Sequence, residues 1–145
     1  MSETAAYRYR NSIELAEKTI KADEGLRLEL YKDTVGKLTI GYGRCLDDTG
    51  ITRDEAEYLF HNDIIRVVDG LKRMDFWKTL SANRQAVLIN MTFCLGIHGI
   101  KKFKNMIAAL RIGDYSEAAA QILDSKFARQ TGQRANRLAV SMAAG

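Results

Sequence analysis

The order of hydrophobic and polar positions divides the chain into helical stretches and one short extended stretch. Residues 9–24 carry an apolar stripe at helical spacing, and Gly25 stands where that helix would end. Residues 26–31 alternate apolar and charged side chains, which is typical of a half-buried strand. A turn containing Asp33 and Gly36 follows, and the β-branched residues after it predict a small antiparallel hairpin or three-stranded sheet.

The remaining residues have helical periodicity. Thr52 and Glu55 form a capping box that opens a long amphipathic helix, expected over residues 53–74. A single long helix directly after a small sheet predicts a bridge between two lobes. The segment 82–95 is apolar on nearly all sides, so we expect it to be the buried centre of the second lobe. Further helices are expected over residues 101–111, 115–127 and 133–143.

Length and composition are those of one globular domain. The chain has 145 residues, of which 46% are hydrophobic and 28% charged, and this excludes disordered and collagen-like classes. With the helical pattern, this predicts an α+β, mainly helical fold. We expect one domain built from a helix and small β lobe (about 1–52), a linking helix (about 53–74) and a helical lobe (about 75–145).

The charge is uneven along the chain. Residues 1–80 contain 13 Lys/Arg and 15 Asp/Glu, a net charge of −2, whereas residues 81–145 contain 9 and 3, a net charge of +6. A basic half favours an anionic polymer as partner. On charge alone, nucleic acid, lipid headgroups and an acidic cell-wall glycan all remain open.

Cysteine and histidine usage predicts neither a metal site nor a disulfide framework. Cys45 and Cys94 make no Cys-x-x-Cys pair, and His61 and His98 have no metal-ligand spacing, so we expect free thiols in a reducing compartment and no cofactor. The N-terminus lacks the apolar core of a signal peptide, and we expect none. No apolar run approaches the roughly 20 residues that span a bilayer, so no stable membrane insertion is expected.

Three side chains around the predicted sheet could carry chemistry. Glu24 ends the first helix, Asp33 lies in the first turn and Thr39 in the next strand. Glycoside cleavage uses one carboxyl group as proton donor and a second carboxylate that activates water or attacks the sugar, and a hydroxyl could hold that water. Taken alone, the same residues fit solvated carboxylates, a turn aspartate bonded to its own backbone and a threonine kept for its β-branch.

Four blocks in order make the catalytic interpretation specific. They read ADEGLRLELYKDTVGKLTIGYG, ITRDEAEYLFHND, AVLINMTFCLG and DYSEAAAQILDSKFARQTGQRANRL. Together the blocks resemble the phage-type lysozymes, glycoside hydrolase family 24, over roughly residues 18–140. The resemblance implies a lysozyme-like two-lobe fold with a small β-sheet lobe, a long interlobe helix and a helical C-terminal lobe.

The resemblance also implies roles for individual residues. Glu24 matches the family's general acid, Asp33 the opposing carboxylate and Thr39 the residue that helps to place the attacking water. Arg134 matches the arginine that pairs with the catalytic glutamate. The implied reaction is inverting hydrolysis of the β-1,4 bond between N-acetylmuramic acid and N-acetylglucosamine in peptidoglycan.

Four further positions match the family's substrate groove. Phe93 matches an aromatic residue that lines the cleft, and a core aromatic remains the alternative. The other three positions, which carry residue types that differ from the family's, are Gln121, Cys45 and Met106. Arg44 replaces a histidine that makes a structural ion pair in the T-even members, so that pair does not carry over.

The implied biology is that of an endolysin. We expect a monomer that acts on peptidoglycan glycan strands, waits in the host cytoplasm and reaches the periplasm and cell wall through a membrane lesion made by a holin. The alternatives are a lytic transglycosylase, which needs the acid but not the water-placing pair, an inactive wall-binding relative, and a basic helical nucleic-acid-binding protein. The last is disfavoured because the basic residues do not gather on one recognition helix.

Overall fold

The structure, a computed structural model, describes residues 7–145. The chain divides into two compact units, one ending at Ala56 and one running from Glu57 to Gly145. We call them the sheet unit and the helical unit. The boundary falls inside helix α4 (Arg53–Leu71). No helix among the described residues is both long and apolar enough to cross a membrane.

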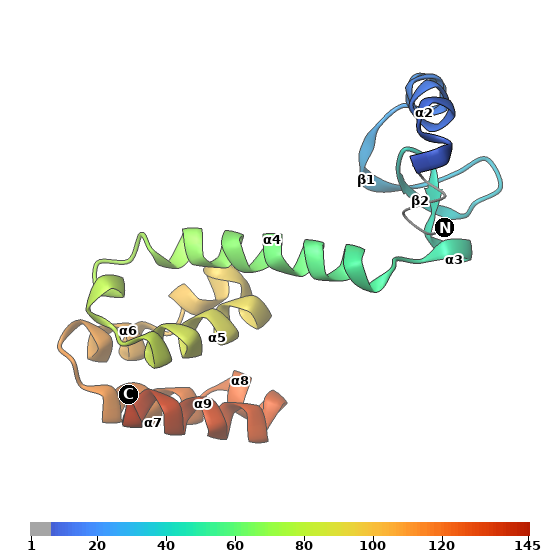
Figure 1. The fold of residues 1–145 in the computed structure, drawn as a ribbon. Coiled ribbons are helices and arrows are strands. Elements are labelled where there is room, and N and C mark those ends of the chain that lie inside the picture. The colour runs from blue at the N-terminus through green and yellow to red at the C-terminus, as the bar shows by residue number, and fades with distance from the viewer. Residues whose placement is uncertain (1–6) are drawn as a thin grey trace. The chain divides into compact units, whose positions relative to one another are not determined.

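Within its described residues, the sheet unit contains a long helix, a small sheet and a short helix before α4. Helix α2 (Arg10–Glu24) is followed by strands β1 (Arg27–Lys32), β2 (Leu38–Gly41) and β3 (Arg44–Cys45), which form an antiparallel sheet in the order β1-β2-β3 (Figure 1). Helix α3 (Leu46–Thr49) follows directly. The chain therefore adopts the three-stranded alternative of the sequence prediction.

The register of the sheet places Thr39 at its centre. Thr39 on β2 pairs with Tyr31 on β1 and with Cys45 on β3. It is 3% exposed, and within the described part of this unit it is the only buried residue. The alternating pattern identified β1, but the burial expected of it is wrong, because Leu28 and Leu30 are exposed on the opposite face from Tyr31.

Helix α4 begins where the capping box predicts. The Thr52 hydroxyl accepts a hydrogen bond from the Glu55 amide at 3.2 Å, and Glu55 accepts one from the Thr52 amide at 2.8 Å. Arg44 donates to Glu55 at 3.0 Å and to the Gly50 carbonyl at 3.0 Å. Arg44 therefore makes an ion pair of its own, with a carboxylate in the first turn of α4.

The helical unit holds the hydrophobic core. Its elements after α4 are η1 (Trp77–Thr79), α5 (Ala82–Lys101), α6 (Lys104–Arg111), α7 (Tyr115–Leu123), α8 (Lys126–Thr131) and α9 (Gln133–Ala144). Val87, Leu88 and Met91 of α5 are buried, which confirms this segment as the centre of the unit. Helices α7 and α9 lie side by side (Figure 1). The predicted α+β, mainly helical fold is confirmed.

Several helix boundaries differ from the sequence prediction, because α4 ends at Leu71 and α6 begins only at Lys104. Gly96 leaves the helical conformation (φ 74°, ψ 163°), as expected, but helical structure resumes after it as far as Lys101. The stretch predicted as one helix over 115–127 is two, because the Ser125 hydroxyl caps a new helix by accepting from the Ala128 amide at 3.0 Å.

Candidate active site

Glu24 is the last residue of α2, and its exposed side chain lies against the loop between β2 and β3. A Cβ atom placed on Gly43 would be only 2.9 Å from Glu24 Oε2 and 3.2 Å from its carboxyl carbon. Gly43 also has φ +80°, which side-chain-bearing residues rarely adopt. The backbone therefore favours glycine here, and a side chain at this position would push the Glu24 carboxyl group aside.

Asp33 is held rigidly by its own turn. Its Oδ1 atom accepts hydrogen bonds from the Val35 and Lys37 amides, both at 2.9 Å. The Asp33 amide donates to the Lys37 carbonyl at 2.9 Å. This is the turn-aspartate bonding that sequence alone left open, but it uses one carboxylate oxygen. Within residues 7–145, Oδ2 has no hydrogen-bond partner and can accept a bond from water.

Thr39 joins the same network through Lys37. Its hydroxyl donates to the Lys37 carbonyl at 3.1 Å, the oxygen that also accepts from the Asp33 amide. The proton of the Thr39 hydroxyl is thereby committed, and its oxygen lone pairs remain to accept a bond. The main chain of Lys37 thus fixes the predicted carboxylate and the predicted hydroxyl relative to each other.

The Lys37 side chain binds the short helix α3. Its ammonium group lies 2.7 Å from Asp48 Oδ1, and this pair raises the pKa of Lys37. The hydrogen bonds of Lys37 and of the Cys45 thiol lower the pKa of Asp48. Next to it, Asp47 accepts from the Leu38 amide at 2.8 Å. Cys45, a predicted groove residue, is half-buried in β3 and lies beside Asp48.

Arg134 lies in the first turn of α9 and binds α5. Its Nε donates to Asn90 Oδ1 at 2.8 Å and its Nη2 to the Asn90 carbonyl at 3.1 Å. Its guanidinium carbon is 6.0 Å from the ring centre of Phe127. Arg134 and Glu24 belong to different units, so their pairing stays a prediction.

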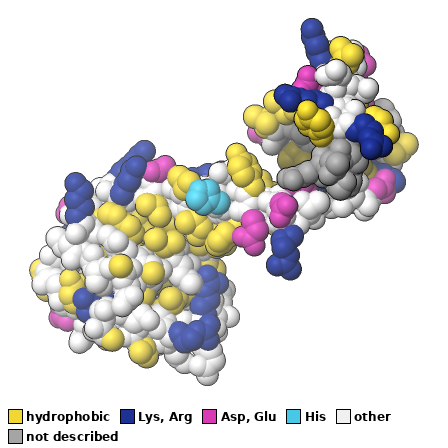
Figure 2. Space-filling view, viewed as in Figure 1, with side chains coloured by type: hydrophobic (Ala, Val, Ile, Leu, Met, Phe, Trp, Pro, Cys, Tyr) yellow, Lys and Arg dark blue, Asp and Glu magenta, His cyan; other side chains and the backbone are white. Residues whose placement is uncertain are grey.

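Phe93 is a surface residue and not a core aromatic. Its side chain is 43% exposed, although it sits on α5, the helix that contributes Val87, Leu88 and Met91 to the core. Its ring meets that of Phe60 edge-to-face, with 5.5 Å between the ring centres. Hydrophobic side chains gather beside α4 on the face shown in Figure 2. The core alternative for Phe93 is therefore wrong.

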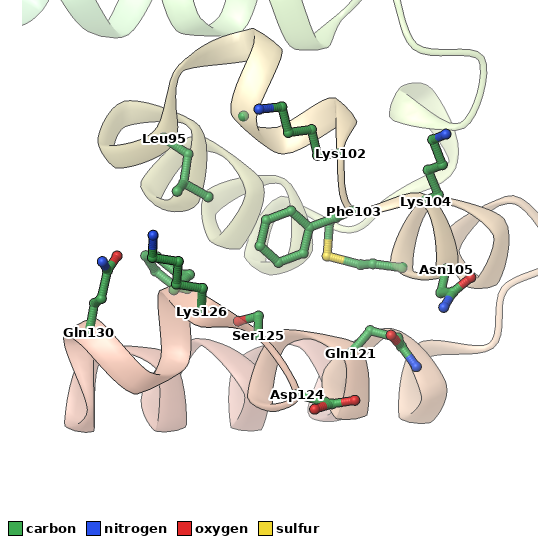
Figure 3. A pocket seen from close by; sticks show the side chains of 13 residues that line it. Leu95, Lys102, Phe103, Lys104, Asn105, Gln121, Asp124, Ser125, Lys126 and Gln130 are labelled. Carbon is green, nitrogen blue, oxygen red and sulfur yellow. The ribbon is translucent and has the colours of Figure 1, made fainter.

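Gln121 and Met106 line one groove in the helical unit. The groove encloses about 580 Å³, and its polar lining includes Asn105, Ser125 and Gln130. Figure 3 shows these side chains around the groove, which lies between α7–α8 and the first turn of α6. The buried side chain of Met106 forms part of its wall. The structure thus brings together two of the four predicted groove positions.

Sequence reasoning missed several residues that shape these sites. Gly43 could have been found, because Gly41 and Gly43 indicate a turn directly after the strand of Thr39. Asn90 could have been flagged as the one amide within the apolar run AVLINMTFCL, and the structure places it at an exposed position. Phe60 has no such signal, because its apolar position in α4 looks like any other at helical spacing.

Comparison with known proteins identifies the family. The family model described as phage lysozyme matches residues 21–140, most of the chain. The chain belongs to the phage lysozyme family. Membership covers the sheet unit from the end of α2 onward and nearly all of the helical unit, and it supports a lysozyme-type function, the cleavage of peptidoglycan by a glycoside hydrolase.

Individual relatives include proteins named lysozyme and endolysin. The chain is 31% identical to the pre-baseplate central spike protein of Enterobacteria phage T4 over 87% of its own length, but it spans only 27% of that protein. It is 28% identical to probable T4-type lysozyme 2 of Dictyostelium discoideum, covering 82% of this chain and 88% of the relative. It is 30% identical to an endolysin of Acyrthosiphon pisum secondary endosymbiont phage 1, covering 79% and 80%.

Proposed function

We propose that the chain is an endolysin that hydrolyses the β-1,4 bond between N-acetylmuramic acid and N-acetylglucosamine in peptidoglycan, with inversion at the sugar carbon. Glu24 acts as general acid, and Asp33 and Thr39 direct water to the opposite face of the sugar. The observation that supports this most is the network that ties Asp33 and Thr39 to the same Lys37 main chain.

The free acceptor sites of that network suit a nucleophilic water. Asp33 Oδ2 can accept one proton of the water as general base, and Thr39 Oγ1 can accept a hydrogen bond from the other. Both acceptors are held by main-chain hydrogen bonds, so they need little reorganisation when the water attacks. Glu24 supplies the second carboxyl group, which donates a proton to the leaving sugar oxygen.

The first test replaces the acid. Glu24→Gln keeps the side-chain shape but removes the transferable proton, so we expect lysis of permeabilised cells to fall at least about a hundredfold. Glu17→Gln on the same helix is the matched control, because Glu17 is also an exposed glutamate of α2. Equal activity of the Glu24→Gln variant and the control would contradict the acid role, and a wild type without lysis would support an inactive wall-binding relative.

The role of Thr39 is separated from packing by two substitutions. Thr39→Val keeps the β-branch and loses the hydroxyl, whereas Thr39→Ser keeps the hydroxyl. If the hydroxyl holds water, kcat falls in the valine variant and largely survives in the serine variant. If Thr39 serves only the sheet, valine retains activity and serine is the poorer substitute.

Analysis of the products distinguishes the mechanisms. Inverting hydrolysis releases reducing ends that are first in the α configuration, which NMR detects before mutarotation. Retaining hydrolysis gives the β configuration first. A lytic transglycosylase needs no water and leaves anhydro-muramyl ends, which mass spectrometry detects and which would overturn the hydrolase proposal.

Arg134 is proposed as the partner of Glu24 and Phe93 as a substrate contact. Arg134→Gln should lower activity more than Arg134→Lys, because lysine keeps a positive charge. Phe93→Ala should raise KM with little loss of stability, since the ring is partly exposed already. Unchanged kinetics of the Phe93→Ala variant would remove it from the substrate groove. Gln121, Cys45 and Met106 are further proposed groove residues.

We also propose the endolysin life cycle for this chain, acting as a monomer. In the host it waits in the cytoplasm and reaches the wall only when a holin opens the membrane. Expression alone should then leave cells intact, and addition of a membrane-permeabilising agent should lyse them within minutes. Spontaneous lysis on expression would contradict the need for a separate membrane lesion.

A further inference from the structure

A second cavity in the helical unit is surrounded by positive charge. It encloses about 590 Å³ between the segment after α4, the end of α5 and helix α6. Four cationic side chains and one carboxylate line it: Arg73, Lys101, Lys104, Arg111 and Asp75. We call it the basic pocket. It shares Lys104 with the groove that contains Gln121 but is otherwise lined by different residues.

The positive charge of the basic pocket is largely uncompensated. Asp75 pairs with Arg111, whose Nε lies 3.1 and 3.2 Å from the two carboxylate oxygens. Among the described residues no other carboxylate forms a salt bridge with these four cations. Like charges held around one cavity repel each other, and an anion in their midst would relieve that repulsion.

Arg111 is prepared to bind an anion. Its pair with Asp75 uses only the Nε–H group, so the four N–H groups of the two terminal nitrogens remain. The terminal nitrogens of a guanidinium group can bind two oxygens of one planar or tetrahedral anion. Lys104 extends away from Gln121 in Figure 3, so its ammonium group is available to the basic pocket.

The remaining lining indicates what the anion is attached to. Met74, Phe76 and Ile107 contribute apolar surface beside the cations. The volume lies within the range of roughly 300–1,000 Å³ typical of small-molecule sites. Four cations against one carboxylate suit a phosphate group, because its charged oxygens can accept hydrogen bonds from several cations at once.

We propose that the basic pocket binds a phosphate-bearing ligand, either a soluble phosphate ester or the headgroup of an anionic phospholipid. This site is separate from Glu24, Asp33 and Thr39 and does not depend on the proposed hydrolysis. Binding of an anion there should stabilise the folded helical unit, because ligands of the native state shift unfolding by mass action.

The test uses the full chain and two probes. Inorganic diphosphate represents the soluble source, and phosphatidylglycerol vesicles, with phosphatidylcholine vesicles as the neutral comparison, represent the lipid. The site variant is Arg73→Gln/Lys101→Gln, neither of which lines the Gln121 groove. The control is Lys78→Gln/Arg129→Gln, which removes the same charge from exposed positions outside both cavities.

We expect the site variant to bind at least one probe about tenfold more weakly than the control does. Diphosphate should raise the Tm of the wild type and of the control. The changes in protein NMR chemical shift that it causes should concentrate at residues 72–76 and 101–111. If the site variant binds diphosphate more weakly than the control does, the ligand is a soluble phosphate ester. If its binding is weakened only for phosphatidylglycerol vesicles, the ligand is a lipid headgroup. If neither probe binds, or if site variant and control weaken equally, the proposal is wrong.

Discussion

At the scale of single residues, the sheet unit places the Glu24 carboxyl group against Gly43. The carboxyl group packs where a side chain would begin, and the backbone of Gly43 has positive φ. Glu24 itself ends a helix, so its position follows from α2, whereas Gly43 belongs to the turn between β2 and β3. The helix end and the sheet are thus matched to each other at one glycine.

Gly43→Ala should therefore impair activity beyond its effect on stability. Positive φ alone costs about 1–2 kcal/mol for alanine, and the new methyl group must also displace the Glu24 carboxyl. Gly50→Ala is the matched control, because Gly50 has φ +61° but open space around it. We expect both variants to unfold at lower urea concentrations and only Gly43→Ala to lose most of its kcat. Equal kcat values for the two folded variants would contradict a functional contact.

At the same scale, the sequence identified residues but not their partners. Glu24, Asp33 and Thr39 could be predicted because a resemblance carries residue types at fixed spacing. The mediator Lys37 acts through its main chain, which any residue type supplies, so no side-chain pattern reveals it. The exposure of Phe93 was equally hidden, because an aromatic residue within an apolar helix has the same sequence pattern whether it faces the core or the solvent.

At the scale of elements, the first turn of α4 is fixed by several interactions at once. Glu55 accepts from the Thr52 amide and from Arg44 of β3. The Thr52 amide, and next the positive charge of Arg44, hold the pKa of Glu55 below its usual value of 4.5. The ionised form of Glu55 is thus favoured by folding, and the helix start is joined to the sheet.

This arrangement predicts a pH-dependent stability. Because the folded-state pKa of Glu55 is lowered, its contribution is complete above about pH 4.5 and is lost as the pH falls through the folded-state pKa. Glu55→Gln should therefore destabilise the chain at pH 7, and the difference from wild type should shrink on acidification. Urea unfolding between pH 7 and 3 measures this, with exposed Glu57→Gln as control. A difference that stays constant with pH would contradict it.

The end of α9 is held by a side chain from α5. Arg84 Nε donates to the Met142 carbonyl at 2.8 Å and Nη2 to the Ala143 carbonyl at 3.2 Å, and its guanidinium carbon lies 3.5 Å from the ring centre of Tyr115. The last carbonyls of a helix have no partners within it, and a cation there also interacts favourably with the negative end of the helix dipole. Arg84 therefore couples α5, α7 and α9.

Arg84→Gln should lower the free energy of unfolding by roughly 2 kcal/mol, because it removes a charged donor from the part-buried Met142 carbonyl and a second from the Ala143 carbonyl. Arg137→Gln on α9 is the control, since that exposed arginine has no salt bridge among the described residues. Thermal unfolding followed by circular dichroism compares the two. A variant at 84 as stable as the control would show that the carbonyls are equally well satisfied by water.

Element types were predicted more reliably than element ends. Helical periodicity gave α4, α5 and α9 because each buries one face over several turns. The split between α7 and α8 was missed because apolar residues continue through it at helical spacing. The Ser125 hydroxyl caps a new helix there, and this hydrogen bond is visible only in the folded chain. The exposure of Leu28 in β1 shows the same limit, since alternation predicts a strand but not which face is covered.

At the scale of the whole molecule, the uneven charge follows the structural units. The sheet unit contains 9 Lys/Arg and 11 Asp/Glu, a net charge of −2, and the helical unit contains 13 and 7, a net charge of +6. The proposed catalytic carboxylates thus lie in the acidic unit and Arg134 in the basic one. An excess of positive charge attracts an anionic wall over distances longer than any single contact.

Adsorption to the wall should therefore depend on charge separately from catalysis. With the hydrolysis-deficient variant Glu24→Gln, raising NaCl from about 0.05 to 0.5 M shortens the screening length about threefold, and binding to isolated sacculi should fall several-fold while binding to neutral chitin does not. Adding Arg129→Glu and Arg137→Glu lowers the net charge of the helical unit from +6 to +2 and should weaken adsorption at low salt. Lysine at the same two positions should not, because the charge is kept. If adsorption changes neither with salt nor with charge reversal, the protein binds the wall through its groove contacts alone.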